Sequence, residues 1–226
     1  TTGREPQLVS AIEAYYKAQG MFGMPKPGEI DYSQVIELDL NSIVPSLSGP
    51  KRPQDRVSLP GLGRDFEKLF CAPTDKNGYA RPAADLNRRE PTGHAFDVGH
   101  GDVLIASITS CTNTSNPALL LAAGLLAKRA VEKGLMPHPR IKTSLAPGSK
   151  VVTDYLKDAG LLPYLEKLGF GVVAYGCTTC MGAAGPLDAK IEEAVVSKDL
   201  VTCAVRSEEH TSELQSLAYL VCRLLL

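Results

Sequence analysis

The chain has 226 residues, a formal net charge of −1, 44% hydrophobic residues and 22% charged residues. These values are ordinary for a globular protein and leave room for one large domain or two small ones. The near-neutral charge argues against a nucleic acid or an anionic membrane as partner, and no apolar run approaches the about 18 residues that a membrane span needs.

Cysteine usage indicates a reducing compartment. The six cysteines are too sparse for a disulfide scaffold, and the N-terminal segment lacks the apolar core of an export signal. We therefore expect a cytoplasmic protein with reduced thiols. The first residue is Thr1 rather than methionine, and we expect the chain to be cut from a longer one.

The first hundred residues predict little regular structure. Apolar residues at helical spacing predict a helix over Gln7–Gln19, which Gly20 ends. A breaker segment rich in glycine and proline follows over 21–28. Alternation of apolar and polar residues predicts a strand over Val35–Leu40. We expect a short helix over Asp65–Phe70 and otherwise surface connection.

Strands and helices alternate after residue 101. The predicted strands are Asp102–Thr109, Ile141–Leu145, Gly171–Tyr175 and Leu200–Val205. The predicted helices are Leu119–Val131, Lys150–Ala159, Pro163–Leu168 and Asp188–Ser197. Asn116 and Pro117 suit the cap and first position of the first of these helices. This alternation is typical of an α/β fold, in which helices cover a parallel sheet.

Three cysteines follow two of these strands. Cys111 comes after the strand over 102–109, and Cys177 and Cys180 form a Cys-x-x-Cys loop after the strand over 171–175. Because ligands bind beyond the carboxyl ends of parallel strands, we expect both loops to open on the same edge. Three thiolates suit an iron–sulfur cluster or zinc.

Other uses of the Cys-x-x-Cys loop stay open at this point. A structural zinc site normally needs a fourth protein ligand, and His94, His100 and His138 have no paired ligand spacing. A thioredoxin-like redox pair usually opens a helix directly, whereas glycines and a proline occupy 182–186. These patterns favour a cluster in which one iron lacks a protein ligand.

The segment from Arg206 to Leu226 interrupts the alternation where another loop is due. Its sequence Arg-Ser-Glu-Glu-His-Thr-Ser-Glu-Leu-Gln-Ser resembles the translation of a sequencing-library adapter. We therefore expect 206–226 to be a non-native tail that carries no functional group.

Five segments of the chain resemble the aconitase family, in the branch that contains aconitase A and the iron regulatory proteins. They are Tyr16–Gly20, Ser48–Val57, Ser110–Pro117, Lys142–Ser149 and Tyr175–Cys180. The resemblance implies a three-layer α/β/α domain with a mainly parallel sheet. It also implies that 1–28 ends a preceding aconitase domain and that 29–205 is the cluster-binding domain, truncated at its C-terminal end before the tail.

The resemblance further implies a [4Fe–4S] cluster held by Cys111, Cys177 and Cys180. Its open iron would act as a Lewis acid in the dehydration of citrate to cis-aconitate and the rehydration to isocitrate, a step of the tricarboxylic acid cycle. The candidates for hydrogen bonds beside the sulfurs are Ser110, Thr112, Asn113 and the backbone of Gly176. Loop shaping and helix capping are the alternative roles of these residues, and the loop over 142–150 either faces substrate carboxylates or is a plain connection.

Two departures from the family set the expected activity. The usual Gly-Asn-Ser-Gly type run after Cys180 is Gly182-Ala183-Ala184-Gly185 here, so two small polar groups are lost. The tail replaces the family's Asn-Arg-Asn-Phe-x-Gly-Arg segment, whose arginines grip substrate carboxylates. The domain with the Asp-Ser-His segment and the domain with the serine base are also missing. We therefore assign no catalytic residue and expect the chain to be inactive without the domains of a full-length parent.

Two rival functions fit the same resemblance. A 2-methylisocitrate dehydratase is compatible with Thr178-Thr179 and the run over 142–152, whereas the loop over 51–56 favours an aconitase. An RNA-binding protein of the iron-regulatory type would need a basic face. This neutral chain offers only small basic spots, at Lys51, Arg52 and Arg56 and at Arg88 and Arg89.

Overall fold

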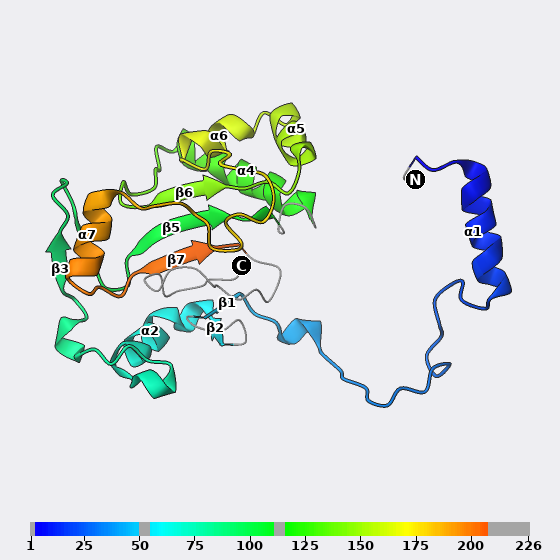
Figure 1. The fold of residues 1–226 in the computed structure, drawn as a ribbon, viewed down its shortest axis with the longest axis horizontal. Helices are drawn as coiled ribbons and strands as arrows, with labels where there is room; N and C mark the ends of the chain where they lie inside the picture. The colour runs from blue at the N-terminus through cyan, green and yellow to red at the C-terminus, as the bar shows by residue number, and fades with distance from the viewer. Residues whose placement is uncertain (1–2, 50–54, 111–115, 208–226) are drawn as a thin grey trace. The chain divides into compact units, whose positions relative to one another are not determined.

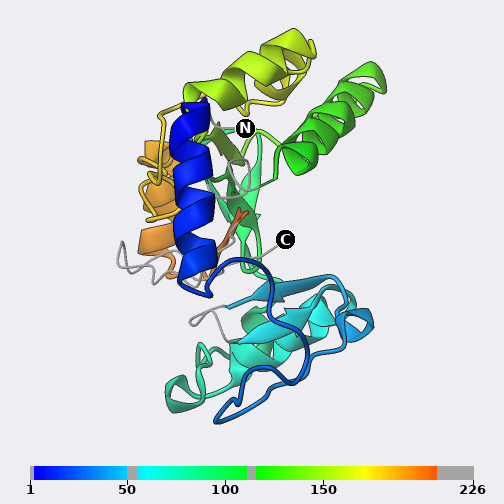
Figure 2. The same ribbon diagram turned by 90° about the vertical axis from the view of Figure 1, so that its right-hand side faces the viewer.

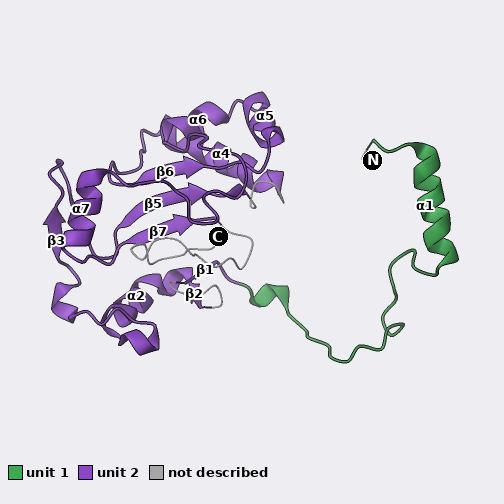
Figure 3. Cartoon of the chain, viewed as in Figure 1, with its two compact units in different colours: residues 1–43 green, residues 44–226 purple. Residues whose placement is uncertain are grey.

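A computed structural model describes residues 3–49, 55–110 and 116–207. The chain divides into two compact units, residues 1–43 and residues 44–226 (Figure 3). The boundary that we predicted between residues 28 and 29 stays a prediction. Within the described ranges, no helix combines the length and the apolar character that crossing a membrane requires.

The first unit contains helix α1, Pro6–Ala18, and a long irregular segment that ends in the 3₁₀ turn Leu40–Ser42. The helix confirms the prediction from apolar spacing, and a proline occupies its first turn, where no amide donor is needed. The predicted strand Val35–Leu40 is wrong. Its apolar side chains are exposed, with Ile36 84% accessible, and the segment pairs with no described strand. Alternation alone does not make a strand without a partner.

The second unit begins with short elements that the sequence did not predict. Two antiparallel pairs of three-residue strands flank helix α2, Leu62–Cys71, which extends the predicted short helix at both ends. The strands are β1 Ser46–Ser48, β2 Arg56–Ser58, β3 Arg89–Pro91 and β4 Asp97–Gly99. The 3₁₀ turns beside them are Leu59–Gly61, Thr74–Lys76 and Ala83–Asp85.

A parallel three-stranded sheet confirms the predicted α/β fold (Figure 1). Its order is β6-β5-β7, with β5 at Val103–Ile108, β6 at Lys142–Leu145 and β7 at Cys203–Arg206. The helices that follow the strands are α4 Pro117–Glu132, α5 Lys150–Asp158, α6 Leu162–Lys167 and α7 Ala189–Ser197. The Asn116 side chain caps α4 by accepting a hydrogen bond from the amide of Ala118, as the sequence predicted.

The helices cover both faces of the sheet. Figure 2 shows α7 on one side of the strands and α4 on the other. One apolar cluster joins β6 to α4, α5 and α6 and contains Leu120, Leu145, Leu156 and Leu165. The other joins β4 and β5 to α7 and contains Val98, Leu104, Ile191 and Val195. Burial on both faces explains why the central strand β5 is mainly apolar rather than alternating.

The edges of the sheet differ from the prediction. Segment 171–175 forms a single parallel bridge, between Val172 and Leu145, rather than a full strand. It still lies beside β6, because the Leu145 amide donates to the Gly171 carbonyl and the Val173 amide donates to the Leu145 carbonyl, each at 3.0 Å. At the opposite edge, β7 begins and ends later than predicted. Residues 208–226 of the predicted tail lie outside the described residues.

Candidate functional site

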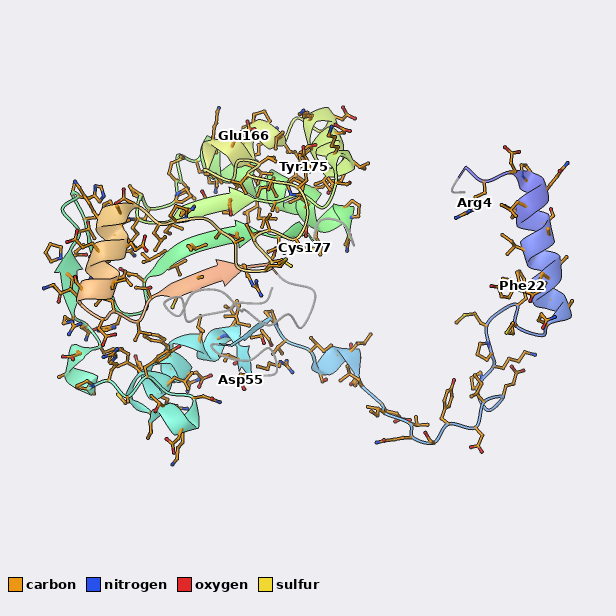
Figure 4. The ribbon with its side chains drawn as sticks, in the orientation of Figure 1. Arg4, Phe22, Asp55, Glu166, Tyr175 and Cys177 are labelled. Carbon is orange, nitrogen blue, oxygen red and sulfur yellow. The ribbon has the colours of Figure 1, made fainter. Side chains whose placement is uncertain are left out.

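The site lies at the edge where the parallel strands end. Figure 1 shows β5, β6 and β7 pointing the same way, toward the loop that carries Cys177 in Figure 4. Cys177 and Cys180 lie among the described residues. Cys111, Thr112 and Asn113 lie outside the described residues, so their predicted roles stay predictions.

The Cys-x-x-Cys loop closes on itself through backbone hydrogen bonds. The Met181 amide donates to the Cys177 carbonyl at 3.2 Å, and the Gly182 amide donates to the Thr179 carbonyl at 3.1 Å. Gly176 opens the loop with φ +95° and Gly182 closes it with φ +89°. Both values lie where a Cβ atom is strained, which explains a glycine at each end. The loop exposes Cys177 and buries Cys180, which is 5% accessible.

Ser110 joins the end of β5 to this loop. Its hydroxyl donates to the Cys177 sulfur at 3.5 Å, across 67 positions of sequence. The end of β5 therefore contacts the Cys-x-x-Cys loop, and Ser110 immediately precedes Cys111 in the sequence. This hydrogen bond fixes the Cys177 sulfur at the end of β5.

Gly176 does not fill the role predicted for its backbone amide. That amide donates to the carbonyl of Pro147 at 2.8 Å, so it is not available to a sulfur. The bond instead ties the start of the loop to the connection between β6 and α5. This gives the segment over 142–150 a described role in supporting the loop.

Arg206 also contacts the loop, and the sequence analysis missed it. This side chain ends β7 and is only 6% accessible. Its guanidinium donates to the carbonyl oxygens of Thr179, at 3.4 Å, and Cys180. No periodic pattern predicts a buried arginine, and the predicted tail begins at this residue. Arg206 pairs with Ser107 in the sheet, and the Ser207 amide donates to the Ser107 carbonyl at 3.0 Å.

Thr179 supplies a buried polar atom without a described partner. Its side chain is 2% accessible, and its Oγ1 atom makes no hydrogen bond to any described group. Buried hydroxyls are normally paired, so one without a described partner, between two cysteines in the sequence, is consistent with a bound group that accepts hydrogen bonds. Thiolates and hydroxyl donors fit an anionic iron–sulfur group at this loop.

No set of three potential metal ligands among His, Cys, Asp and Glu occurs in the described parts of the chain. The third predicted ligand, Cys111, is outside those parts. The histidines weighed as zinc ligands are engaged elsewhere. His94 lies 2.8 Å from a carboxylate oxygen of Asp188, and His100 accepts a hydrogen bond from the Val201 amide at 2.9 Å. His138 accepts one from the Arg140 amide.

Lys142, the first residue of the segment over 142–150, is also bonded to a neighbour. Its ammonium group donates to the Pro186 carbonyl at 2.6 Å. Lys142 is the first residue of β6, so it lies at the opposite end of the strands from the cysteines. Burial lowers the pKa of this lysine, because the charged form loses hydration.

Comparison with known proteins identifies relatives of this chain. The model of the aconitase family (aconitate hydratase) matches residues 1–207. Aconitate hydratase A of Thermus thermophilus is 51% identical over 216 residues, which cover 94% of this chain and 24% of that protein. The same protein of Deinococcus radiodurans is 50% identical over 213 residues, and that of Bacillus subtilis is 46% identical over 216 residues, each with the same two coverages. The chain thus spans about a quarter of the length of these curated relatives.

Proposed function

The chain belongs to the aconitase family, and from this membership we propose that it holds a [4Fe–4S] cluster through Cys111, Cys177 and Cys180. The observation that carries the proposal is the contact between Ser110 and Cys177. It brings the residue next to Cys111 to the Cys-x-x-Cys loop, at the edge of the sheet where ligands bind.

We propose that the whole protein interconverts citrate and isocitrate through cis-aconitate in the tricarboxylic acid cycle. The names of the relatives support this reaction over its rivals. When bound, the cluster supplies a Lewis-acidic iron that makes hydroxide a better leaving group. We also propose a cytoplasmic location, which the free cysteines of the described residues favour.

The chain's own residues prepare the site for such a group. The loop buries Cys180 and leaves Cys177 accessible, so one side of the site is dry and the other open. The Ser110 hydroxyl donates to the Cys177 sulfur and so holds it beside the end of β5. Arg206 holds the backbone of Thr179 and Cys180 against the end of β7.

The RNA-binding alternative receives no support from the described basic residues. Arg88 lies 3.3 Å from a carboxylate oxygen of Glu90, and Arg89 lies 2.7 Å from one of Asp97. Arg56 donates to the Ser46 hydroxyl. These side chains are committed to neighbours rather than gathered into a basic face.

We keep the non-native tail as a proposal and place its start at residue 208. Arg206 pairs in the sheet, the Ser207 amide donates to the Ser107 carbonyl, and both residues fall within the family match, which ends at residue 207. The adapter-like sequence continues beyond that point without a match to the family.

Anaerobic reconstitution tests the cluster. The full chain, incubated with iron and sulfide, should become brown, absorb broadly in the visible range and contain iron by elemental analysis. Cys111→Ser, Cys177→Ser or Cys180→Ser should abolish the colour. Cys71→Ser is the matched control, because Cys71 is an exposed thiol at the end of α2. A colourless protein that binds one equivalent of zinc would overturn the proposal.

A further inference from the structure

The hydroxyl of Tyr175 ties the start of the Cys-x-x-Cys loop to helix α5. Its oxygen lies 3.1 Å from Oγ1 of Thr153. Thr153 is buried in the first turn of α5 and donates its own hydroxyl hydrogen to the Lys150 carbonyl at 2.7 Å. Because a threonine hydroxyl has one hydrogen, Tyr175 is the donor to Thr153. The bonds therefore run in one direction, from Tyr175 through Thr153 to the backbone of Lys150.

A second bond fixes the next residue. The Gly176 amide donates to the Pro147 carbonyl at 2.8 Å, in the connection between β6 and α5. Two consecutive residues of the loop's stem are thus attached to the same support, one by a side chain and one by the backbone. In Figure 4, Tyr175 lies toward α5, whereas Cys177 lies at the ends of the strands.

We propose that Tyr175 is a positioning residue for Cys177 and Cys180. The loop beyond Gly176 is closed by its own backbone bonds and is held at its far side by Ser110 and Arg206, so the stem is a further point at which it is fixed. Fixing the stem keeps Cys177 against Ser110 and keeps Cys180 buried. Ligands need such support, because a site that is loose by about 1 Å binds poorly. The purpose of this positioning rests on the proposed cluster, whereas its mechanics belong to the chain alone.

The cysteines provide an internal test in the cluster-free chain. Cys71 is exposed, and Cys180 and Cys203 are buried in different elements. Their alkylation rates, resolved peptide by peptide by mass spectrometry, separate local opening of the loop from unfolding of the sheet. Loss of one neutral hydrogen bond should accelerate alkylation of Cys180 about fivefold in Tyr175→Phe. Cys71 and Cys203 should react at unchanged rates.

Variants of the partner test the bond itself. Thr153→Val removes the acceptor and should accelerate the alkylation of Cys180 as Tyr175→Phe does. Thr153→Ser keeps a hydroxyl, so Cys180 should be alkylated at the wild-type rate in that variant. The double variant Tyr175→Phe/Thr153→Val should be no faster than the faster single variant, because both remove one interaction. Tyr164→Phe, on α6, is the matched control, since its ring packs against Lys128 and Lys167.

The outcomes decide between positioning and general stability. Equal acceleration of Cys180 and Cys203 in Tyr175→Phe, or no acceleration of either, overturns the inference. In the reconstituted chain, Tyr175→Phe should lose its visible absorbance to an iron chelator several times faster than Tyr164→Phe, and equal rates count against positioning of the cluster. Failure of the wild type to reconstitute overturns the proposed function instead, and the alkylation result stands apart from it.

Discussion

Gly169 lies where helix α6 turns into the stem of the Cys-x-x-Cys loop, and alanine there should be strongly destabilising. The residue has φ +83°, and its amide donates to the Glu166 carbonyl at 2.8 Å. A Cβ atom at this position would lie 2.3 Å from Oγ1 of Thr143, on β6. That oxygen cannot simply rotate away without loss, because it donates to the Leu168 carbonyl at 3.3 Å.

Two costs contribute to Gly169→Ala. The left-handed backbone conformation costs an alanine about 1–2 kcal/mol. Forcing an extra carbon against β6 adds about 1–3 kcal/mol, as for other overpacked sites. Together they predict a loss of about 2–5 kcal/mol in the free energy of unfolding. Gly160→Ala is the matched control, because Gly160 follows α5 with φ +66° and a Cβ atom there meets nothing within 4 Å.

Urea unfolding measures the difference. Gly169→Ala should lower the midpoint well below that of Gly160→Ala, with the same m-value in both. Thr143→Ala alone should cost about 1 kcal/mol through its lost hydrogen bond. In the Gly169→Ala background it should restore stability instead, because it removes the clashing oxygen. Equal midpoints for Gly169→Ala and Gly160→Ala, or further destabilisation by Thr143→Ala in the Gly169→Ala background, would refute this reasoning.

Four other predictions concern the core, the pH dependence, the tail and the activity. Leu156→Ala should lower the free energy of unfolding by about 2–5 kcal/mol in the same urea assay, because the Leu156 side chain on α5 is fully buried in an apolar cluster. A loss below about 1 kcal/mol would contradict this packing. Burial, and then the charge of Arg88, lowers the pKa of His100 below its ordinary value of 6.5. As the pH falls, the unfolded chain therefore binds this proton at a higher pH than the folded chain does. Stability should therefore fall as the pH drops below about 6.5, by at most about 1.4 kcal/mol per pH unit, and His100→Gln should flatten this dependence of the urea midpoint. Deleting residues 208–226 should leave the urea midpoint unchanged, and a drop in the midpoint would show that the tail is native. The purified 226-residue chain should convert no citrate to isocitrate in a coupled assay, because we expect it to lack the family's serine base and its carboxylate-binding arginines. Conversion that Cys177→Ser abolishes would contradict this prediction.

The sequence predicted the elements whose periodicity extends over several turns or residues. Helices α1 and α4 form where expected because each repeats its apolar spacing over several turns, and strand β5 does because its residues form a largely apolar run. The three-residue strands β1 to β4 are too short to show a period of two. The segment over 35–40 shows that period, yet no described strand pairs with it, since pairing depends on residues distant in sequence.

The candidate site was predictable only as far as sheet topology determines it. A loop after each parallel strand must open at the same edge, which is why Ser110 and Cys177 could be expected to meet. The supports of the loop were not predictable. Arg206 reaches the loop from β7, on one side of β5, and Tyr175 reaches it from the segment beside β6, on the other side. These contacts depend on which strands are neighbours rather than on any local pattern.

The order of the strands explains why the loop needs both supports. Segment 171–175 lies beside β6, and β6 lies beside β5, so the chain must pass the end of β6 to bring Cys177 to Ser110. Neighbouring strands are about 4.8 Å apart, so the crossing from segment to β5 covers about 10 Å within a few residues. Gly176 makes the turn with its positive φ, and the carbonyl of Pro147 holds it there. A Cys-x-x-Cys spacing alone therefore does not create this site. β6 ends level with β5, where Leu145 pairs with Ile108, and the crossing chain is bonded at Gly176 to Pro147 in the loop that follows β6.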